Sequence, residues 1–125
     1  MLGGFSQGAA LAAWAAAECP HKLGGVVLWS GYAPRAAALQ AALSKGAQSK
    51  GVPFLIAHGD ADPKVLPEAG AVLMEAVASS GVAVRGKTVY KGLGHGCTRE
   101  ELETLANFAA GVCPPKGKEE ASKRD

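Results

Sequence analysis

Short, uninterrupted apolar runs that alternate with helical stretches constrain the fold of this chain more than any other feature. The two clearest runs are GVVLWS at residues 25–30 and VPFLIAH at residues 52–58, and both are rich in β-branched and aromatic residues. Strands of a parallel sheet are apolar on both faces, because helices cover both sides of such a sheet. The alternation therefore predicts an α/β fold with a mainly parallel sheet.

The other expected elements fill the sequence around these two runs. A strand end is expected at residues 1–4, a further strand at residues 82–90, and helices at residues 6–18, 36–44, 67–80 and 98–110. The first helix is apolar on nearly every side, so we expect most of it to be buried. The last begins with the Thr98–Glu101 spacing of a capping box and should end at Gly111. Together these elements predict three to four parallel strands with flanking helices.

Charge and cysteine usage limit the partners and the compartment. A formal net charge of +2 does not indicate a nucleic-acid partner. The longest apolar stretch, residues 9–17, is too short for stable membrane insertion. Three cysteines without metal-ligand or disulfide spacing favour a reducing, cytoplasmic setting and no metal site. Residues 113–125 are rich in proline and charge, which predicts a disordered tail.

The segment Gly4-Phe5-Ser6-Gln7-Gly8 fits the pattern G-x-S-x-G between a strand end and a helix. In a nucleophile elbow the serine occupies a tight turn with unfavourable backbone angles, which lifts its hydroxyl clear of the sheet. Small residues are expected two places to either side, because the strand and helix backbones nearly touch there. Ser6 is thus a candidate nucleophile and the Gln7 amide a candidate oxyanion donor, with an ordinary glycine-rich turn as the alternative.

Carboxylates follow a later strand, where open α/β sheets place functional groups. Asp60 and Asp62 lie two residues apart, and either one can orient a histidine while the other caps the turn. His58 ends the strand itself, so we expect a packed, hydrogen-bonded histidine that takes no part in catalysis.

A histidine flanked by glycines follows the next strand, in Gly92-Leu93-Gly94-His95-Gly96. Its near-neutral pKa suits a general base, and a solvent-exposed loop histidine is the alternative. Serine, aspartate and histidine then occur in the chain order of the α/β-hydrolases, which differs from that of other serine-protease folds.

Four segments together resemble the acyl-protein thioesterases within the phospholipase/carboxylesterase group. These segments are GGFSQGAALA at residues 3–12, LWSGYAP at residues 28–34, PFLIAHGDADPKV at residues 53–65 and YKGLGHGCTREEL at residues 90–102. The resemblance covers nearly the whole chain to about Val112. It implies that residues 1–112 form a partial domain, the C-terminal part of an α/β-hydrolase sheet.

The resemblance also implies roles for individual residues. Ser6 is implied as nucleophile, His95 as base, and Asp62 rather than Asp60 as the residue that orients His95. The implied reaction is hydrolysis of thioesters, typically on S-acylated proteins, or of small acyl esters, without a cofactor. The turn of Ser30, Gly31 and Tyr32 is implied as a substrate-binding segment near the acyl site.

The chain also departs from the family pattern. Family members have a long segment before the elbow that supplies further strands and the second oxyanion amide, and an initiator methionine here stands inside the elbow strand. We therefore expect a truncated enzyme, with an inactive remnant or a non-catalytic binding module as the alternative. A cysteine hydrolase that uses Cys97 and an enzyme similar to the dienelactone hydrolases are less favoured, because the elbow holds serine and Cys97 has no elbow of its own.

Overall fold

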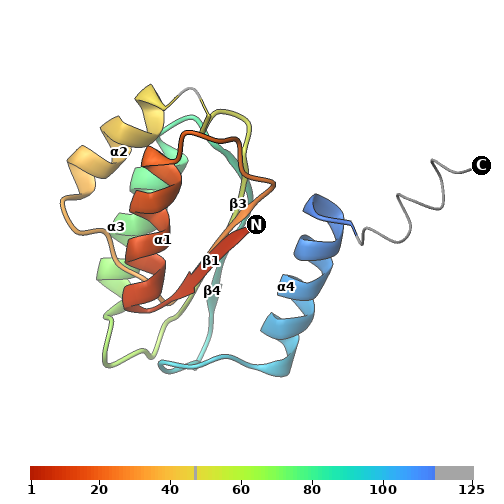
Figure 1. Ribbon diagram of the computed structural model, residues 1–125. Coiled ribbons are helices and arrows are strands. Elements are labelled where there is room, and N and C mark those ends of the chain that lie inside the picture. Colours follow the sequence, from red (N-terminus) through yellow and green to blue (C-terminus); the bar gives the residue numbers. More distant parts are fainter. Residues whose placement is uncertain (47, 115–125) are drawn as a thin grey trace, which may run out of the picture.

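The computed structural model describes residues 1–46 and 48–114, so the tail predicted over residues 113–125 lies almost wholly outside the described residues. Strands and helices alternate along the chain (Figure 1). The elements are β1 (Leu2–Phe5), α1 (Gln7–Glu18), β2 (Val26–Trp29), α2 (Ala36–Lys45), β3 (Pro53–Gly59), α3 (Pro67–Ala78), β4 (Ala83–Tyr90) and α4 (Arg99–Val112).

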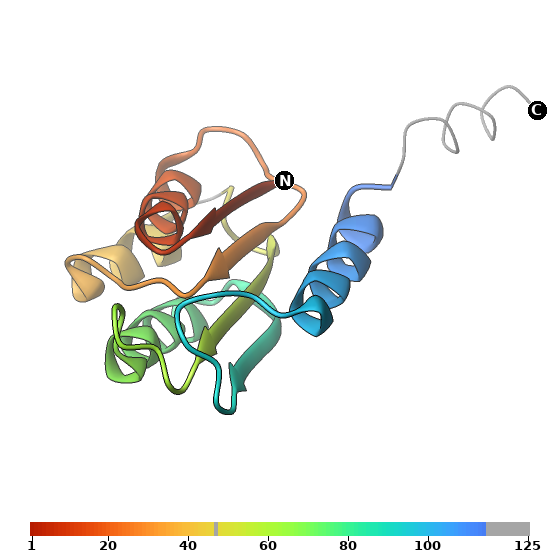
Figure 2. The same cartoon turned by 90° about the horizontal axis from the view of Figure 1, so that it is seen from below.

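The four strands form one parallel sheet in the order β1-β2-β3-β4, which confirms the predicted α/β class and strand number. Each strand is joined to the next by a helix, and such parallel crossovers take one hand. Helices α1, α2 and α3 accordingly cover one face of the sheet, whereas α4 lies on the other (Figure 2). All carboxyl ends of the strands therefore meet at one edge of the sheet, where the loops that carry the candidate residues also begin.

Strand β2 is buried on both sides and divides the core in two. Val26 and Leu28 point into the larger cluster, which α1, α2 and α3 close. Val27 and Trp29 point into a smaller cluster, against which Leu105 and Phe108 of α4 pack. The uninterrupted apolar character of residues 25–30 is explained by this double burial.

Two expectations about the helices are wrong. Helix α1 is not mostly buried, because one flank stays open and Leu11 is 71 % exposed. Only its alanine-rich side packs against the sheet. Helix α4 does not end at Gly111 but continues to Val112, since glycine is tolerated in a helix when no other feature stops it.

Strand β1 lies at the edge of the sheet and pairs only with β2 within the described ranges. None of the helices described there is long and apolar enough to cross a membrane.

Candidate active site

Ser6 lies at the junction of β1 and α1 in a conformation that is rare for serine, with φ 60° and ψ −120°. Its amide donates to the Trp29 carbonyl of β2 at 2.8 Å, and its own carbonyl accepts from the Ala9 amide at 3.0 Å. Ser6 is the N-cap of α1, yet its side chain makes no capping hydrogen bond. The backbone thus holds the turn on both sides and the hydroxyl is not used to cap the helix.

The two glycines of the G-x-S-x-G pattern have different surroundings. A Cβ atom on Gly4 would lie 2.0 Å from the carbonyl oxygen of Gly8, so the strand and the helix meet too closely for any side chain there. A Cβ atom on Gly8 would meet no described atom within 4 Å apart from its chain neighbours and the backbone of its own helix. The expectation that both positions need small residues is therefore right for Gly4 and wrong for Gly8.

Alanine substitutions at these two positions are expected to act in opposite directions. Gly4→Ala forces the Gly8 carbonyl away and should lower the free energy of unfolding by about 3 kcal/mol or more, as backbone strain at a packed site does. Gly8→Ala replaces a helical glycine in open space and should raise it by about 0.5–1 kcal/mol. Urea unfolding followed by circular dichroism measures both values. Equal effects would contradict the elbow geometry.

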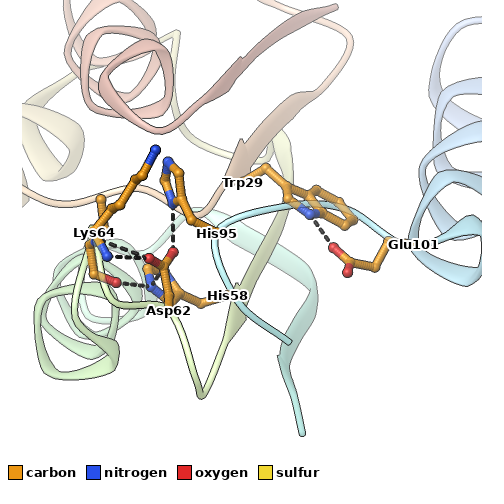
Figure 3. Close-up of polar contacts among 7 residues, drawn as sticks. Trp29, His58, Asp62, Lys64, His95 and Glu101 are labelled. Atoms are coloured by element: carbon orange, nitrogen blue, oxygen red, sulfur yellow. Dashed lines mark hydrogen bonds and ion pairs between the residues drawn. The ribbon is translucent and has the colours of Figure 1, made fainter. Parts of the chain in front are cut away.

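Asp62 lies in the loop after β3 and is 2 % exposed. One carboxylate oxygen, Oδ1, accepts from the amides of Lys64 and Val65, both at 2.9 Å. The other, Oδ2, lies 2.7 Å from Nδ1 of His95 (Figure 3). Because an ionised carboxylate only accepts, Nδ1 of His95 carries the proton of this bond and Nε2 is left as the basic nitrogen.

Two opposing influences act on the pKa of Asp62. Burial pushes the pKa of this carboxyl upward, but the hydrogen bond from His95, the amides of Val65 and Lys64, and the charge of His95 outweigh burial and hold the pKa below its usual value. The carboxylate therefore stays ionised at neutral pH. An ionised carboxylate in this place fixes the tautomer of His95.

The structure brings Asp62, and not Asp60, to His95. The carboxylate of Asp60 instead accepts from the Gly92 amide at 2.7 Å and so fastens the start of the histidine loop. The Ala61 amide adds a second link to the same loop by donating to the Leu93 carbonyl at 3.0 Å. The sequence spacing could not decide which aspartate contacts His95. In the structure Asp62 makes that contact, and Asp60 binds the Gly92 amide.

His58 is 3 % exposed and donates from Nε2 to the Val65 carbonyl at 2.8 Å. A Cβ atom on Gly70 of α3 would lie 2.4 Å from Nδ1 of His58, so glycine at that position makes room for the ring. The ring is therefore packed and hydrogen-bonded, as expected from its place at the strand end.

The ring of His95 lies against the ring of Phe5, the residue before Ser6, with centroids 4.8 Å apart. This contact brings the histidine loop across β2 and β3 to the carboxyl end of β1. No hydrogen bond joins the Ser6 hydroxyl to His95 in the described part of the chain. Hydrogen bonds between catalytic groups are often long before a substrate binds. The arrangement of Ser6, His95 and Asp62 is therefore compatible with proton transfer.

The turn implied as a substrate-binding segment is packed inward. Ser30 has φ 51°, is fully buried, and its hydroxyl makes no hydrogen bond with any described residue. A Cβ atom on Gly31 would lie 2.5 Å from Cβ of Ala9, so this glycine allows the turn to contact α1 closely. Tyr32 is half-buried. The turn therefore packs against α1, the helix that follows Ser6.

An apolar groove of about 400 Å³ lies between the β1 side of the sheet and the N-terminal half of α4. Its lining comprises Met1, Gly3, Gly4, Phe5, Val27, Trp29, Cys97, Leu102 and Leu105. The sequence did not reveal this groove, because it is lined by consecutive residues of β1 and alternate residues of β2, and neither strand shows a polar–apolar alternation in its sequence. A buried contact between Trp29 and Glu101 beside it was also not predicted (Figure 3).

A family model described as Phospholipase/Carboxylesterase matches residues 1–112. Acyl-protein thioesterase 1 of Aspergillus fumigatus is 35% identical over 122 residues, which cover 98% of this chain and 51% of that protein. A probable carboxylesterase of Arabidopsis thaliana, described as SOBER1-like, is 35% identical over 105 residues, which cover 84% of this chain and 39% of that protein.

Solved structures show the same fold. Arabidopsis thaliana SOBER1 matches with a TM-score of 0.73 and 33% identity, over 85% of this chain and 49% of that chain. Zea mays acyl-protein thioesterase 2 matches with a TM-score of 0.76 and 28% identity, over 88% of this chain and 54% of that chain. The chain thus spans about half the length of the relatives it matches.

Proposed function

The chain belongs to the phospholipase/carboxylesterase family, and on that premise we propose that it carries the catalytic centre of a serine hydrolase. In this proposal Ser6 is the nucleophile, His95 the general base and Asp62 the residue that orients His95 and stabilises its cation. The observation that carries the proposal is the 2.7 Å hydrogen bond between His95 and Asp62, beside an elbow that bears Ser6.

The proposed reaction has two steps. Oγ of Ser6 attacks the acyl carbonyl while Nε2 of His95 takes the hydroxyl proton, and the same proton then passes to the departing thiolate or alkoxide. Water then attacks the acyl-serine while Nε2 of His95 takes a proton from it. The bond between the acyl carbon and Oγ breaks, the proton passes from His95 to Oγ of Ser6, and the carboxylic acid is released. Asp62 stabilises the His95 cation in both steps and does not itself become protonated.

The N-terminus of α1 supports a role for Gln7 in binding the developing oxyanion. Gln7 is the first residue of α1, and amides of a first helical turn need no acceptor within the helix. The helix dipole adds partial positive charge at the same place. Loss of one such oxyanion donor raises the barrier by about 3 kcal/mol in serine hydrolases, so the Gln7 amide would contribute on that scale.

The substrate class follows from the family. Relatives named acyl-protein thioesterase and carboxylesterase support two candidate classes, S-acylated proteins and small acyl esters. We place the reaction in the cytoplasm, where the free cysteines Cys19, Cys97 and Cys113 would stay reduced. Neither a cofactor nor a nucleic-acid partner enters the proposal.

A substrate comparison tests this proposal. The purified chain is given p-nitrophenyl esters of increasing acyl length and an S-palmitoylated peptide, and product release is measured for each. Turnover of any of these substrates that requires Ser6 supports the proposal. Turnover of none by a folded sample would refute it, and the ratio of thioester to ester turnover separates the two substrate classes.

Cys97 is expected to be dispensable. Burial first, and then the nearby Glu101 carboxylate, raises the pKa of the Cys97 thiol, so little thiolate is present at neutral pH. Cys97→Ala should therefore change the rate of ester hydrolysis by less than about threefold, a small effect for a residue outside the reacting groups. Loss of activity in Cys97→Ala with activity retained in Ser6→Ala would favour a cysteine hydrolase instead.

A second candidate function is that of a non-catalytic binding module or inactive remnant. The apolar groove and the edge position of β1 favour this reading, because both offer surface that further polypeptide could cover. On either reading residues 1–112 are proposed to act as a partial α/β-hydrolase domain. A monodisperse, folded chain without hydrolase activity would support the binding module over the enzyme.

A further inference from the structure

We propose that Trp29 and Glu101 are positioning residues that together set the place of His95 relative to Ser6. The proposal rests on the proposed function and adds to it two residues that lie outside the three catalytic side chains. It stands on hydrogen bonds from one residue, Trp29, to both of the segments that must meet in the site.

The main chain of Trp29 holds the elbow. Its carbonyl accepts from the amide of Ser6 at 2.8 Å, so the end of β2 fixes the turn that carries the nucleophile. The side chain of Trp29 stacks on Tyr90 at the end of β4, with centroids 6.4 Å apart and an interplanar angle of 27°. Trp29 is 5 % exposed, so the packing leaves its indole little freedom.

The indole of Trp29 holds the histidine loop through Glu101. Its Nε1–H donates to Oε2 of Glu101 in the first turn of α4 (Figure 3). The other oxygen, Oε1, accepts from the amide of Thr98 at 3.2 Å, and the Glu101 amide donates to Oγ1 of Thr98 at 3.2 Å. The segment that leaves His95 is therefore held to β2 through Glu101, which accepts from the Thr98 amide as well as from the Trp29 indole.

Burial of Glu101 is not needed for capping alone. A glutamate at the third helical position completes a capping box equally well when it is exposed to solvent. Glu101 is instead fully buried, and a buried carboxylate is costly unless donors satisfy both oxygens. The donor that satisfies Oε2 is the indole of Trp29, which makes this contact the distinctive feature of the helix start.

The loop at residues 92–96 needs an external contact to fix its conformation, because its own backbone is flexible. Gly92, Gly94 and Gly96 surround His95, and glycine adopts many more backbone conformations than other residues. Asp60 fastens the beginning of the loop through the Gly92 amide at 2.7 Å. The Trp29–Glu101 bond fastens its end, so His95 is held between two anchored points.

The chain offers a matched control for Trp29. Trp14 of α1 also donates one indole hydrogen bond, to the Pro34 carbonyl at 3.0 Å, and it lies away from the histidine loop. Trp29→Phe and Trp14→Phe therefore make the same chemical change and each remove one such bond. Only Trp29→Phe removes the hydrogen bond to Glu101, which holds the segment that follows His95.

The first measurement is the rate at which a fluorophosphonate probe labels the full chain. Trp29→Phe is expected to slow labelling about 10-fold or more, because small displacements of reacting groups have effects of that size. Trp14→Phe should change it less than about twofold. Glu101→Gln keeps one acceptor oxygen and the capping-box spacing, so it should slow labelling to an intermediate degree. In the double variant Trp29→Phe/Glu101→Gln the two effects should not add, as expected for residues that act through one bond.

The second measurement does not depend on activity. In wild type, nuclear Overhauser contacts should join the ring protons of Phe5 and His95, whose centroids are 4.8 Å apart. These contacts should weaken in Trp29→Phe and Glu101→Gln and persist in Trp14→Phe, while thermal unfolding shows that each variant is folded. Persistence of the contacts in Trp29→Phe, or equal changes in the two tryptophan variants, would overturn the proposal. A wild-type chain that shows the contacts but does not react with the probe would refute the proposed function. The comparison of the Phe5–His95 contacts in Trp29→Phe and Trp14→Phe would then still test the positioning role.

Discussion

Ser6→Ala is expected to reduce hydrolysis by about 10⁴-fold or more, the size of effect that removal of an attacking serine has in serine hydrolases. Alanine at this position keeps the strained backbone and loses only the hydroxyl, which makes no capping bond. Stability should therefore change little, and urea unfolding measures it alongside initial rates of ester and thioester hydrolysis.

The matched control is Ser44→Ala on the exposed side of α2, where the hydroxyl donates to the Gln40 carbonyl of its own helix. This variant should hydrolyse substrate at the wild-type rate. If Ser6→Ala kept more than a tenth of the wild-type activity, the nucleophile would have to be sought elsewhere.

Asp62→Asn is expected to lower kcat by about 10³- to 10⁴-fold with little change in KM. The asparagine oxygen can still accept from the amides of Lys64 and Val65, and this turns its NH₂ group toward Nδ1 of His95. Nδ1 then becomes the acceptor, the proton moves to Nε2, and the nitrogen that should receive the serine proton is blocked. Steady-state kinetics of the purified variant test this result.

Asp60→Asn serves as the comparison, because Asp60 contacts the loop through one backbone amide and does not touch His95. Its effect on kcat should stay below about tenfold, as expected for a group that acts only through loop position. Equal losses in the two variants would contradict separate roles for the two carboxylates.

Asp62 should also affect how the free energy of unfolding changes with pH in the acid range. Its pKa in the folded chain is below the ordinary value of 3.8, so its contribution to stability is present above that pH and is lost as pH falls through the folded-state pKa. Wild type should therefore lose stability below about pH 3.8 more steeply than Asp62→Asn. Urea unfolding at neutral and acid pH, carried out on both chains, provides the check.

Much of the fold was predictable because burial on both faces leaves a direct record in the sequence. Residues 26–29 and 53–57 are apolar without interruption, and the structure buries both strands to which they belong almost completely. Strand β1 was expected only as a strand end, since four residues that include two glycines carry little pattern. The open flank of α1 was not predictable, because an alanine-rich helix looks alike whether one side is covered or not.

The candidate site was only partly predictable. Chain order pointed to Ser6 and His95, but the spacing of Asp60 and Asp62 could not decide between them. The choice of Asp62 came from a family resemblance, and the hydrogen bond to His95 agrees with it. The contact of Trp29 with Glu101 joins residues 72 positions apart, and neither belongs to a motif that implies the other. Such contacts depend on how α4 packs, which no local pattern encodes.

The most direct test of the central claim is to label the folded chain with a fluorophosphonate probe and to locate the adduct by peptide mass spectrometry. The account predicts one adduct, on Ser6, that forms in wild type, is absent from Ser6→Ala and is strongly reduced in Asp62→Asn. An adduct on any other residue, or a folded wild-type chain that takes no probe, would contradict the assignment of Ser6, Asp62 and His95 as a working catalytic centre.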